Sequence, residues 1–390
     1  MSIMTELALQ QRTAKILDQR AHDLLLGHSF AHQQIGFIHT LDIDYGEPMK
    51  QRTLLQVEVS AQQKRKQTST AHHKYRAQAS EQLHKVIETA IFKQLEDIDA
   101  VIQTTIGIED SVATILDILA VKSASVGRLE PLVNDLSWLG RELVTLVNLP
   151  YYRNQRSKKN TAVKVDSPAL ALRYIGLDNL QLVIPTFAVR HWMPHSTEPF
   201  SLLKRRLRDS AMANAIAAQK IAELNDVNDI HAFTLGMLLD VGRITLVRLY
   251  LKTFEQVWQR KVQIARQENQ KDLHTALLEL KPDPLFLTTL LCNKSIQVSA
   301  RVIDKMAFKY LPFKGVMEQL QNGVNKGDTA LPLTQVMLKA RCYSQYLILK
   351  EHQLIEPDET ASWFSYFQFT KTELKTLQTS NFTNLAIQID

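Results

Sequence analysis

The sequence predicts a mainly helical protein. Only 12 glycines and 12 prolines occur among its 390 residues, and these are the residue types that disfavour helix interiors most strongly. Apolar residues recur at helical spacing in several segments. With 45% apolar and 22% charged residues, the composition is that of an ordinary globular protein. The length is sufficient for two or three domains.

The N-terminal part is expected to be a separate helical module at residues 1–105. Residues 5–26 predict an amphipathic helix, with Thr5 as its cap and Gly27 as its end. The charge-rich stretch 51–84 predicts a solvated helix or a partly flexible segment. Helical spacing then returns at 86–102.

After residue 108 the pattern changes to short helices that follow one another closely. Proline after a cap residue at Ser167-Pro168 is typical of a helix start, whereas Pro150 ends the helix before it. Asp110 is the expected cap of the first short helix. The predicted helices are 111–119, 129–136, 138–147, 168–175, 202–224, 232–251, 285–310, 331–349 and a terminal helix that contains Trp363.

The stretch Ala232-Phe-Thr-Leu-Gly-Met-Leu-Leu-Asp-Val-Gly-Arg243 is the most informative motif of the chain. It is similar to the metal-binding helix of HD-type hydrolases, which reads approximately GLLHDIGK. In those enzymes the adjacent histidine and aspartate both bind a metal. The histidine position is occupied here by Leu239, which cannot coordinate a cation. The positions that match are Gly236, Leu238, Asp240, Gly242 and Arg243.

Two further segments strengthen this resemblance. Residues 148–152 resemble the helix end that reads ANSAFY in the HDOD domain, an output-type relative of the HD hydrolases found in bacterial signalling proteins. Residues 167–180 resemble the segment of that domain that reads SIEEAIALLGLRRL. The resemblance implies an all-α, HD-like helical bundle. We assign it to residues 106–350 and treat 351–390 as a C-terminal helical extension packed on it.

The resemblance also indicates where metal ligands would lie. A first histidine would fall near Asp209, the His-Asp pair at Leu239 and Asp240, and a later histidine near 293–295, where none is present. Asp209 and Asp240 are therefore the only remaining candidates, and a phosphohydrolase site needs several convergent ligands. We predict no catalytic residue, no metal and no cofactor. Asp240 is then expected at a helix end or in a hydrogen bond.

Two other histidine pairs have the spacing of metal ligands on a helix. His28 and His32 are four residues apart, as are His191 and His195. Pro194 interrupts the second pair, and neither pair has an evident third ligand. Neither pair is therefore predicted to bind a metal.

Two basic clusters are a possible surface for an anion or a partner. The net charge of +6 is modest, and both clusters are equally compatible with solvated surface. The first cluster, in a loop, contains Arg153, Arg156, Lys158, Lys159 and Lys164. The second contains Lys204, Arg205, Arg206 and Arg208.

Cys292 and Cys342 lie far apart and form no CxxC unit, which favours a reducing cytoplasm. No signal peptide or membrane span is expected. The sequence thus predicts a non-catalytic, cytoplasmic bacterial signal-transduction or regulatory protein that binds a protein partner through an HDOD scaffold. Two alternatives stay open. One is a divergent metal-dependent phosphohydrolase acting on a nucleotide or cyclic dinucleotide, and the other is a nucleotide or nucleic-acid binder that uses the basic clusters.

Overall fold

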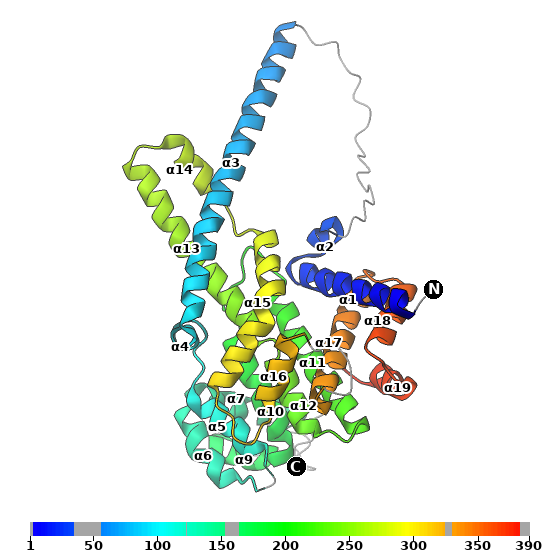
Figure 1. Cartoon of the computed structure of the whole chain (residues 1–390). Helices are drawn as coiled ribbons and strands as arrows, with labels where there is room; N and C mark the ends of the chain where they lie inside the picture. Colours follow the sequence, from blue (N-terminus) through cyan, green and yellow to red (C-terminus); the bar gives the residue numbers. More distant parts are fainter. Residues whose placement is uncertain (1–2, 35–55, 122, 153–163, 324–329, 383–390) are drawn as a thin grey trace.

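The computed structural model describes residues 3–34, 56–121, 123–152, 164–323 and 330–382. Within these ranges every regular element is a helix and no strand occurs (Figure 1). Helices account for 79% of the residues that the structure describes. The predicted all-α fold is confirmed.

The N-terminal region contains two long helices and three short ones. Gly27 separates the first two, as predicted. No glycine or proline occurs between residues 56 and 96, so the polar stretch and the apolar segment after it form one helix. The elements are α1 (Ile3–Leu26), α2 (His28–Gln34), α3 (Gln56–Glu96), α4 (Ile98–Val101) and the π-helix η1 (Ile102–Ile106).

Several short helices follow, and four of them lie close to their predicted positions, whereas the longer helix at Leu177–Trp192 was not predicted. The side chain of Ser167 accepts a hydrogen bond from the backbone N–H of Leu170 at 3.4 Å, as expected of a cap. The predicted cap at Asp110 is wrong, because Glu109 holds the extended cap position and Asp110 is already helical. The helices are α5 (Asp110–Leu119), α6 (Val126–Asp135), α7 (Ser137–Val147), α9 (Pro168–Ile175) and α10 (Leu177–Trp192).

The remaining helices contain the motif. The predicted helix at 232–251 is interrupted at Leu239 and Asp240, so that it forms parts of α12 and α13. The predicted terminal helix is also two helices, and Trp363 is buried in the first of them. The elements are α11 (Leu203–Leu224), α12 (Asp229–Leu238), α13 (Val241–Gln267), α14 (Lys271–Leu278), α15 (Pro284–Lys305), α16 (Phe313–Gln321), α17 (Pro332–Glu351), α18 (Pro357–Tyr366) and α19 (Lys371–Thr379).

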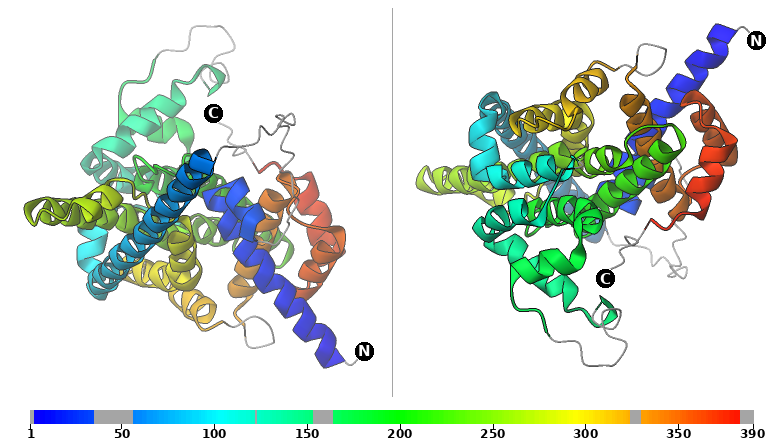
Figure 2. Two further views of the ribbon diagram at one scale, coloured as in Figure 1. Left: turned by 90° about the horizontal axis from the view of Figure 1, so that it is seen from above. Right: turned by 90° about the horizontal axis from the view of Figure 1, so that it is seen from below.

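Both N-terminal long helices pack against the rest of the molecule (Figures 1 and 2). Ile87 and Ile91 of α3 belong to the same apolar core as the helices that follow it. Leu17 and Leu24 of α1 join Trp363 in a smaller cluster formed with α17 and α18. The division at residues 105 and 350 stays a prediction, but the buried side chains of residues 83–101 are continuous with the main core.

Two glycines of the motif allow its helices to approach their neighbours closely. A Cβ atom at Gly236 would lie 2.6 Å from the Cα atom of Ala215 on α11. A Cβ atom at Gly242 would lie 2.1 Å from the backbone oxygen of Ser295 on α15. The break between α12 and α13 is therefore held between α11 and α15, and this contact positions Asp240.

In the part of the chain that the structure describes, one helical stretch, Asp229–Gln267, is long and apolar enough to span a membrane. However, 89% of its most apolar window is buried inside the protein. Its composition is therefore accounted for by its place in the core. The cytoplasmic location stays a prediction.

Candidate functional site

Asp240 is buried at the break between α12 and α13, with 2% of its surface exposed. Its Oδ1 atom lies 2.9 Å from a guanidinium nitrogen of Arg243. Its Oδ2 atom accepts hydrogen bonds from the hydroxyl of Ser210 at 3.0 Å and from the amide of Asn214 at 3.3 Å. Both carboxylate oxygens are thus bound by groups of the protein itself.

A second ion pair lies beside the first. The guanidinium of Arg341 on α17 is 2.7 Å from the carboxylate of Asp18 on α1, and the amide of Gln345 donates to the same oxygen at 2.7 Å. Burial lowers the pKa of Arg341, but Asp18 and Asp240 raise it more. Burial raises the pKa of Asp18, and the neighbouring cation Arg341 and other groups hold it well below its usual range. The two carboxylates and two guanidinium groups form one mutually compensated set, which we call the Asp240 centre.

Helix α1, which supplies Asp18 to this centre, carries two further buried titratable groups, His22 and Asp23. Burial, together with the charge of Arg243, lowers the pKa of His22 to about 4. The neutral ring donates from Nδ1 to the backbone oxygen of Asp18 at 2.7 Å, and its Nε2 atom has no hydrogen-bond partner. Burial raises the pKa of Asp23 to about 6, although a hydrogen bond from Gln19 opposes the shift.

The residues at the predicted ligand positions do not fit a metal ion. Asp209 is 47% exposed and pairs with Arg205 and Arg208 at 3.5 and 3.1 Å. The next residue of α11 bonds Asp240, so Asp209 faces another direction, because consecutive helical residues do not share a face. Leu239 is an apolar, buried neighbour. Among the described residues, no group of three or more His, Cys, Asp or Glu side chains is placed to hold a metal.

The two histidine pairs are engaged in other contacts. The rings of His28 and His352 lie 5.6 Å apart, whereas the side chain of His32 lies outside the described residues. His191 stacks on Trp138 with ring centroids 4.0 Å apart and an interplanar angle of 3°. Burial lowers the pKa of His191. His195 lines a cavity that is described below.

The basic clusters are placed only in part. Lys164, Lys204 and Arg205 are exposed. Arg206 does not belong to the predicted surface, since it is 7% exposed and donates to the backbone oxygen of Leu24. It connects α11 to α1. The positions that lie outside the described residues are Arg153, Arg156, Lys158 and Lys159.

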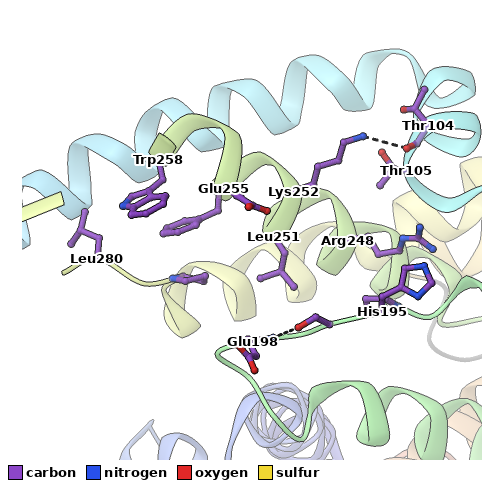
Figure 3. A pocket seen from close by; sticks show the side chains of 14 residues that line it. Thr104, Thr105, His195, Glu198, Arg248, Leu251, Lys252, Glu255, Trp258 and Leu280 are labelled. Carbon is purple, nitrogen blue, oxygen red and sulfur yellow. Dashed lines mark hydrogen bonds between the residues drawn. The ribbon is translucent and has the colours of Figure 1, made fainter. Parts of the chain in front are cut away.

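A second polar site was not predicted from the sequence. It is a cavity of about 540 Å³ bounded by η1, by the segment after α10 and by α13 (Figure 3). Sequence reasoning also missed Asp18, His22 and Arg341, which lie far from the motif along the chain and carry no local pattern. Arg243 could be singled out from the sequence because it matches a position of the motif. Its ion pair with Asp240 could not be predicted.

The fold is all-α, and the aspartate of the motif, Asp240, is paired internally with Arg243. Residues 107–281 match the family model of the HDOD domain, and this part of the chain is an HDOD domain. No curated protein and no solved structure matches the chain. The matched range contains α5 to α14, whereas α1, which supplies Asp18 to the Asp240 centre, precedes it, and α17, which supplies Arg341, follows it.

Proposed function

We propose that this chain is a non-catalytic regulatory protein of bacterial signal transduction that acts by binding a protein partner through its HDOD domain. One observation carries the proposal: the carboxylate of Asp240 is fully engaged by Arg243, Ser210 and Asn214. The aspartate of the family motif therefore serves the packing of α11 against α13 in this proposal.

The energetics of the Asp240 centre support a structural role. A metal ion would have to displace Arg243, whose side chain is 4% exposed, and leave a buried guanidinium without its partner. Removing one partner of a buried ion pair costs about 3–5 kcal/mol. A metal would gain only Asp240 in exchange, because Leu239 offers no ligand and Asp209 faces away. One carboxylate is a weak site for a divalent cation.

The contacts of α1 suggest how a signal would reach the HDOD domain. Arg20 of α1 donates to Glu359 on α18 at 2.7 Å. Asp18, also on α1, is paired with Arg341 on α17. These bonds fix α1 directly over the Asp240 centre. In the proposed function, a change in the position of α1 would change the charges beside Asp240 and therefore the packing of α12 and α13.

Exposed apolar side chains at one end of the HDOD domain provide a surface for the partner. Leu149 and Tyr151, which follow α7, are 44% and 65% exposed. Leu170 on α9 is 41% exposed, and α9 packs against α7. Exposed apolar groups that gather on packed elements are typical of protein interaction sites.

The catalytic part of the proposal is tested by turnover and metal content. We expect purified full-length protein to hydrolyse neither cyclic dinucleotides nor nucleoside phosphates in the presence of Mg²⁺ or Mn²⁺. Metal analysis should give no stoichiometric Fe, Mn or Zn. Turnover that disappears in an Asp240→Ala variant, while an Asp209→Ala variant keeps it, would overturn the proposal in favour of a phosphohydrolase.

The partner is tested by capture from cells that naturally contain the protein. The double variant Tyr151→Glu and Leu170→Glu should lose a partner that the unmodified chain retains. Leu278→Glu on α14 is the matched control, because Leu278 is equally apolar and 53% exposed but lies on another helix. Equal loss of the partner in both variants would contradict the proposed surface.

A further inference from the structure

The cavity of about 540 Å³ beside α13 has the size of a small-molecule site. Its walls come from both parts of the chain (Figure 3). Thr104 and Thr105 belong to η1, whereas His195 and Glu198 follow α10 within the HDOD domain. A molecule bound there would contact the N-terminal region and the HDOD domain together.

One end of the cavity carries positive charge. Arg248 donates to the backbone oxygens of Ile106 at 3.2 Å and Trp192 at 2.9 Å. Lys252 donates to the backbone oxygen of Thr104 at 3.2 Å. Neither cation takes part in a close ion pair among the described residues, and the hydrogen bonds that the structure shows for both go to backbone oxygens.

His195 adds a third nitrogen donor at the same end. Figure 3 shows its ring beside Arg248, with Thr104 and Lys252 near by. Burial lowers the pKa of Arg248, but a guanidinium remains protonated in proteins. Forked donors and an ammonium are the groups that bind carboxylate and phosphate.

The other end of the cavity is apolar and aromatic. Trp258 and Leu280 lie at the end opposite to Arg248 in Figure 3. The indole nitrogen of Trp258 donates to the backbone oxygen of Leu277 at 2.7 Å, which fixes the ring. A fixed indole is a surface on which a flat ring packs well.

Two carboxylates line the cavity between these ends. In Figure 3 Glu255 lies between Trp258 and Lys252, and Glu198 lies below them on the segment that follows α10. A carboxylate accepts hydrogen bonds and does not donate them when ionised. Hydroxyl or amino groups on the middle of a ligand would therefore be recognised there.

We propose that this cavity binds a small aromatic anion: a flat ring with hydrogen-bond donors, joined to a carboxylate or a phosphate. The anionic group lies against Arg248, Lys252 and His195. The ring lies along Trp258, and its donor groups face Glu198 and Glu255. An aromatic carboxylic acid and a nucleoside monophosphate share this chemistry. The inference goes beyond the proposed function, which assigns no small ligand to the chain.

Isothermal titration of the full-length protein at low ionic strength tests the proposal, with adenosine monophosphate and 4-hydroxybenzoate as probes. Adenosine and inorganic phosphate are the matched half-probes. We expect at least one of the two aromatic anions to bind with one site per chain, and each half-probe to bind at least tenfold more weakly. The anion that binds more tightly identifies whether the source is a nucleotide or a carboxylic acid.

Variants locate the bound anion. Lys252→Met and Trp258→Leu should each weaken the tighter probe at least tenfold, because they remove a charge and a ring surface from opposite ends of the cavity. Lys261→Met is the control, since Lys261 is exposed on the same helix but does not line the cavity. Circular dichroism and thermal unfolding establish that all three variants fold.

Three results would overturn the inference. The first is that neither aromatic anion binds at millimolar concentration. The second is that inorganic phosphate binds as tightly as adenosine monophosphate when 4-hydroxybenzoate does not bind. The third is equal weakening by Lys252→Met and Lys261→Met, which would indicate general attraction to a basic protein.

Discussion

The Asp240 centre and the cavity beside α13 are both polar, but they satisfy their charges differently. In the Asp240 centre, Arg243 and Arg341 each face a carboxylate within 3 Å. In the cavity, the hydrogen bonds of Arg248 and Lys252 to described residues go to backbone oxygens. The aspartate of the family motif, Asp240, is therefore bound by groups of the protein itself. The cations without a close carboxylate partner, Arg248 and Lys252, lie instead in a cavity that no sequence motif indicated.

Burial explains the difference. The side chains of Arg243 and Asp240 are 4% and 3% exposed, and a charge removed from water to that degree is stable only when it is paired and hydrogen-bonded. Arg248 is half-buried and Lys252 is exposed, so water solvates part of their charge. Cations of this second kind are the ones that can exchange water for a ligand.

The largest effect is expected from Arg243→Met, which tests whether the Asp240 centre depends on its internal cation. The substitution leaves the carboxylate of Asp240 buried without its ion pair, so the free energy of unfolding should fall by about 3–5 kcal/mol. Urea denaturation measures it. Arg205→Met, which breaks an exposed pair with Asp209, should cost less than about 1 kcal/mol. A similar loss for both variants would remove the distinction between buried and exposed pairs.

A further test concerns His22 and Asp23, the two buried titratable groups that follow Asp18 on α1. The pKa of His22 is lowered to about 4 in the folded chain. Between pH 6.5 and 4, His22 is therefore protonated in the unfolded chain but neutral in the folded chain. Stability due to this group is lost as the pH falls from 6.5 to 4. The pKa of Asp23 is raised to about 6 in the folded chain. As the pH falls from 6 to 4, Asp23 is protonated in the folded chain before it is protonated in the unfolded chain, so its contribution to the free energy of unfolding rises.

The two effects oppose each other, and each amounts to roughly 3 kcal/mol at about 1.4 kcal/mol per pKa unit. Relative to the unmodified chain, His22→Asn should gain stability by roughly that amount as the pH falls from 6.5 to 4. Asp23→Asn should lose a similar amount between pH 6 and 4. Chemical denaturation across this pH range measures both differences. Curves parallel to that of the unmodified chain would show that neither group is buried as described.

The close approach of α13 to α15 gives a smaller effect. In Gly242→Ala the new Cβ atom would meet the backbone oxygen of Ser295 at 2.1 Å and the backbone nitrogen of Ser299 at 2.5 Å. Backbone atoms cannot rotate away, so overpacking should reduce the free energy of unfolding by about 1–3 kcal/mol. Gly127→Ala on α6 is the control, since nothing lies within 4 Å of its Cβ position. Thermal unfolding should show a lower midpoint for Gly242→Ala alone.

Most of the helices were predictable because their signals are local, although no helix was predicted at α10, α14 or α16. Ser167 and Gly176 bound α9 through a cap bond and a positive φ of 75°, and both follow from residue type alone. The break at Leu239 and Asp240 was missed, because those residues continue an apolar helical pattern. The break results from tertiary contacts, in which Ser210 and Ser299 bond groups on either side of it.

Of the candidate site, only the lack of a metal-binding side chain at position 239 could be predicted from the sequence. Leu239 could be identified from the motif as a position without a metal ligand. The second ion pair of the Asp240 centre joins Asp18 to Arg341, which are more than 300 residues apart. No spacing rule connects residues at such separation, and the cavity walls likewise come from segments distant in sequence. The HDOD resemblance predicted the scaffold, whereas no feature of the sequence indicated how its buried charges pair.

The smallest effect on stability is expected from Lys252→Met, which makes the same change of cation to methionine as Arg243→Met. Its ammonium contacts one backbone oxygen, that of Thr104, at 3.2 Å, and its side chain is exposed. The free energy of unfolding should change by no more than about 0.5 kcal/mol. Urea denaturation of the two variants side by side measures the contrast. If Lys252→Met destabilised the fold as much as Arg243→Met, Lys252 would be a structural cation and the cavity would have no charge to offer a ligand.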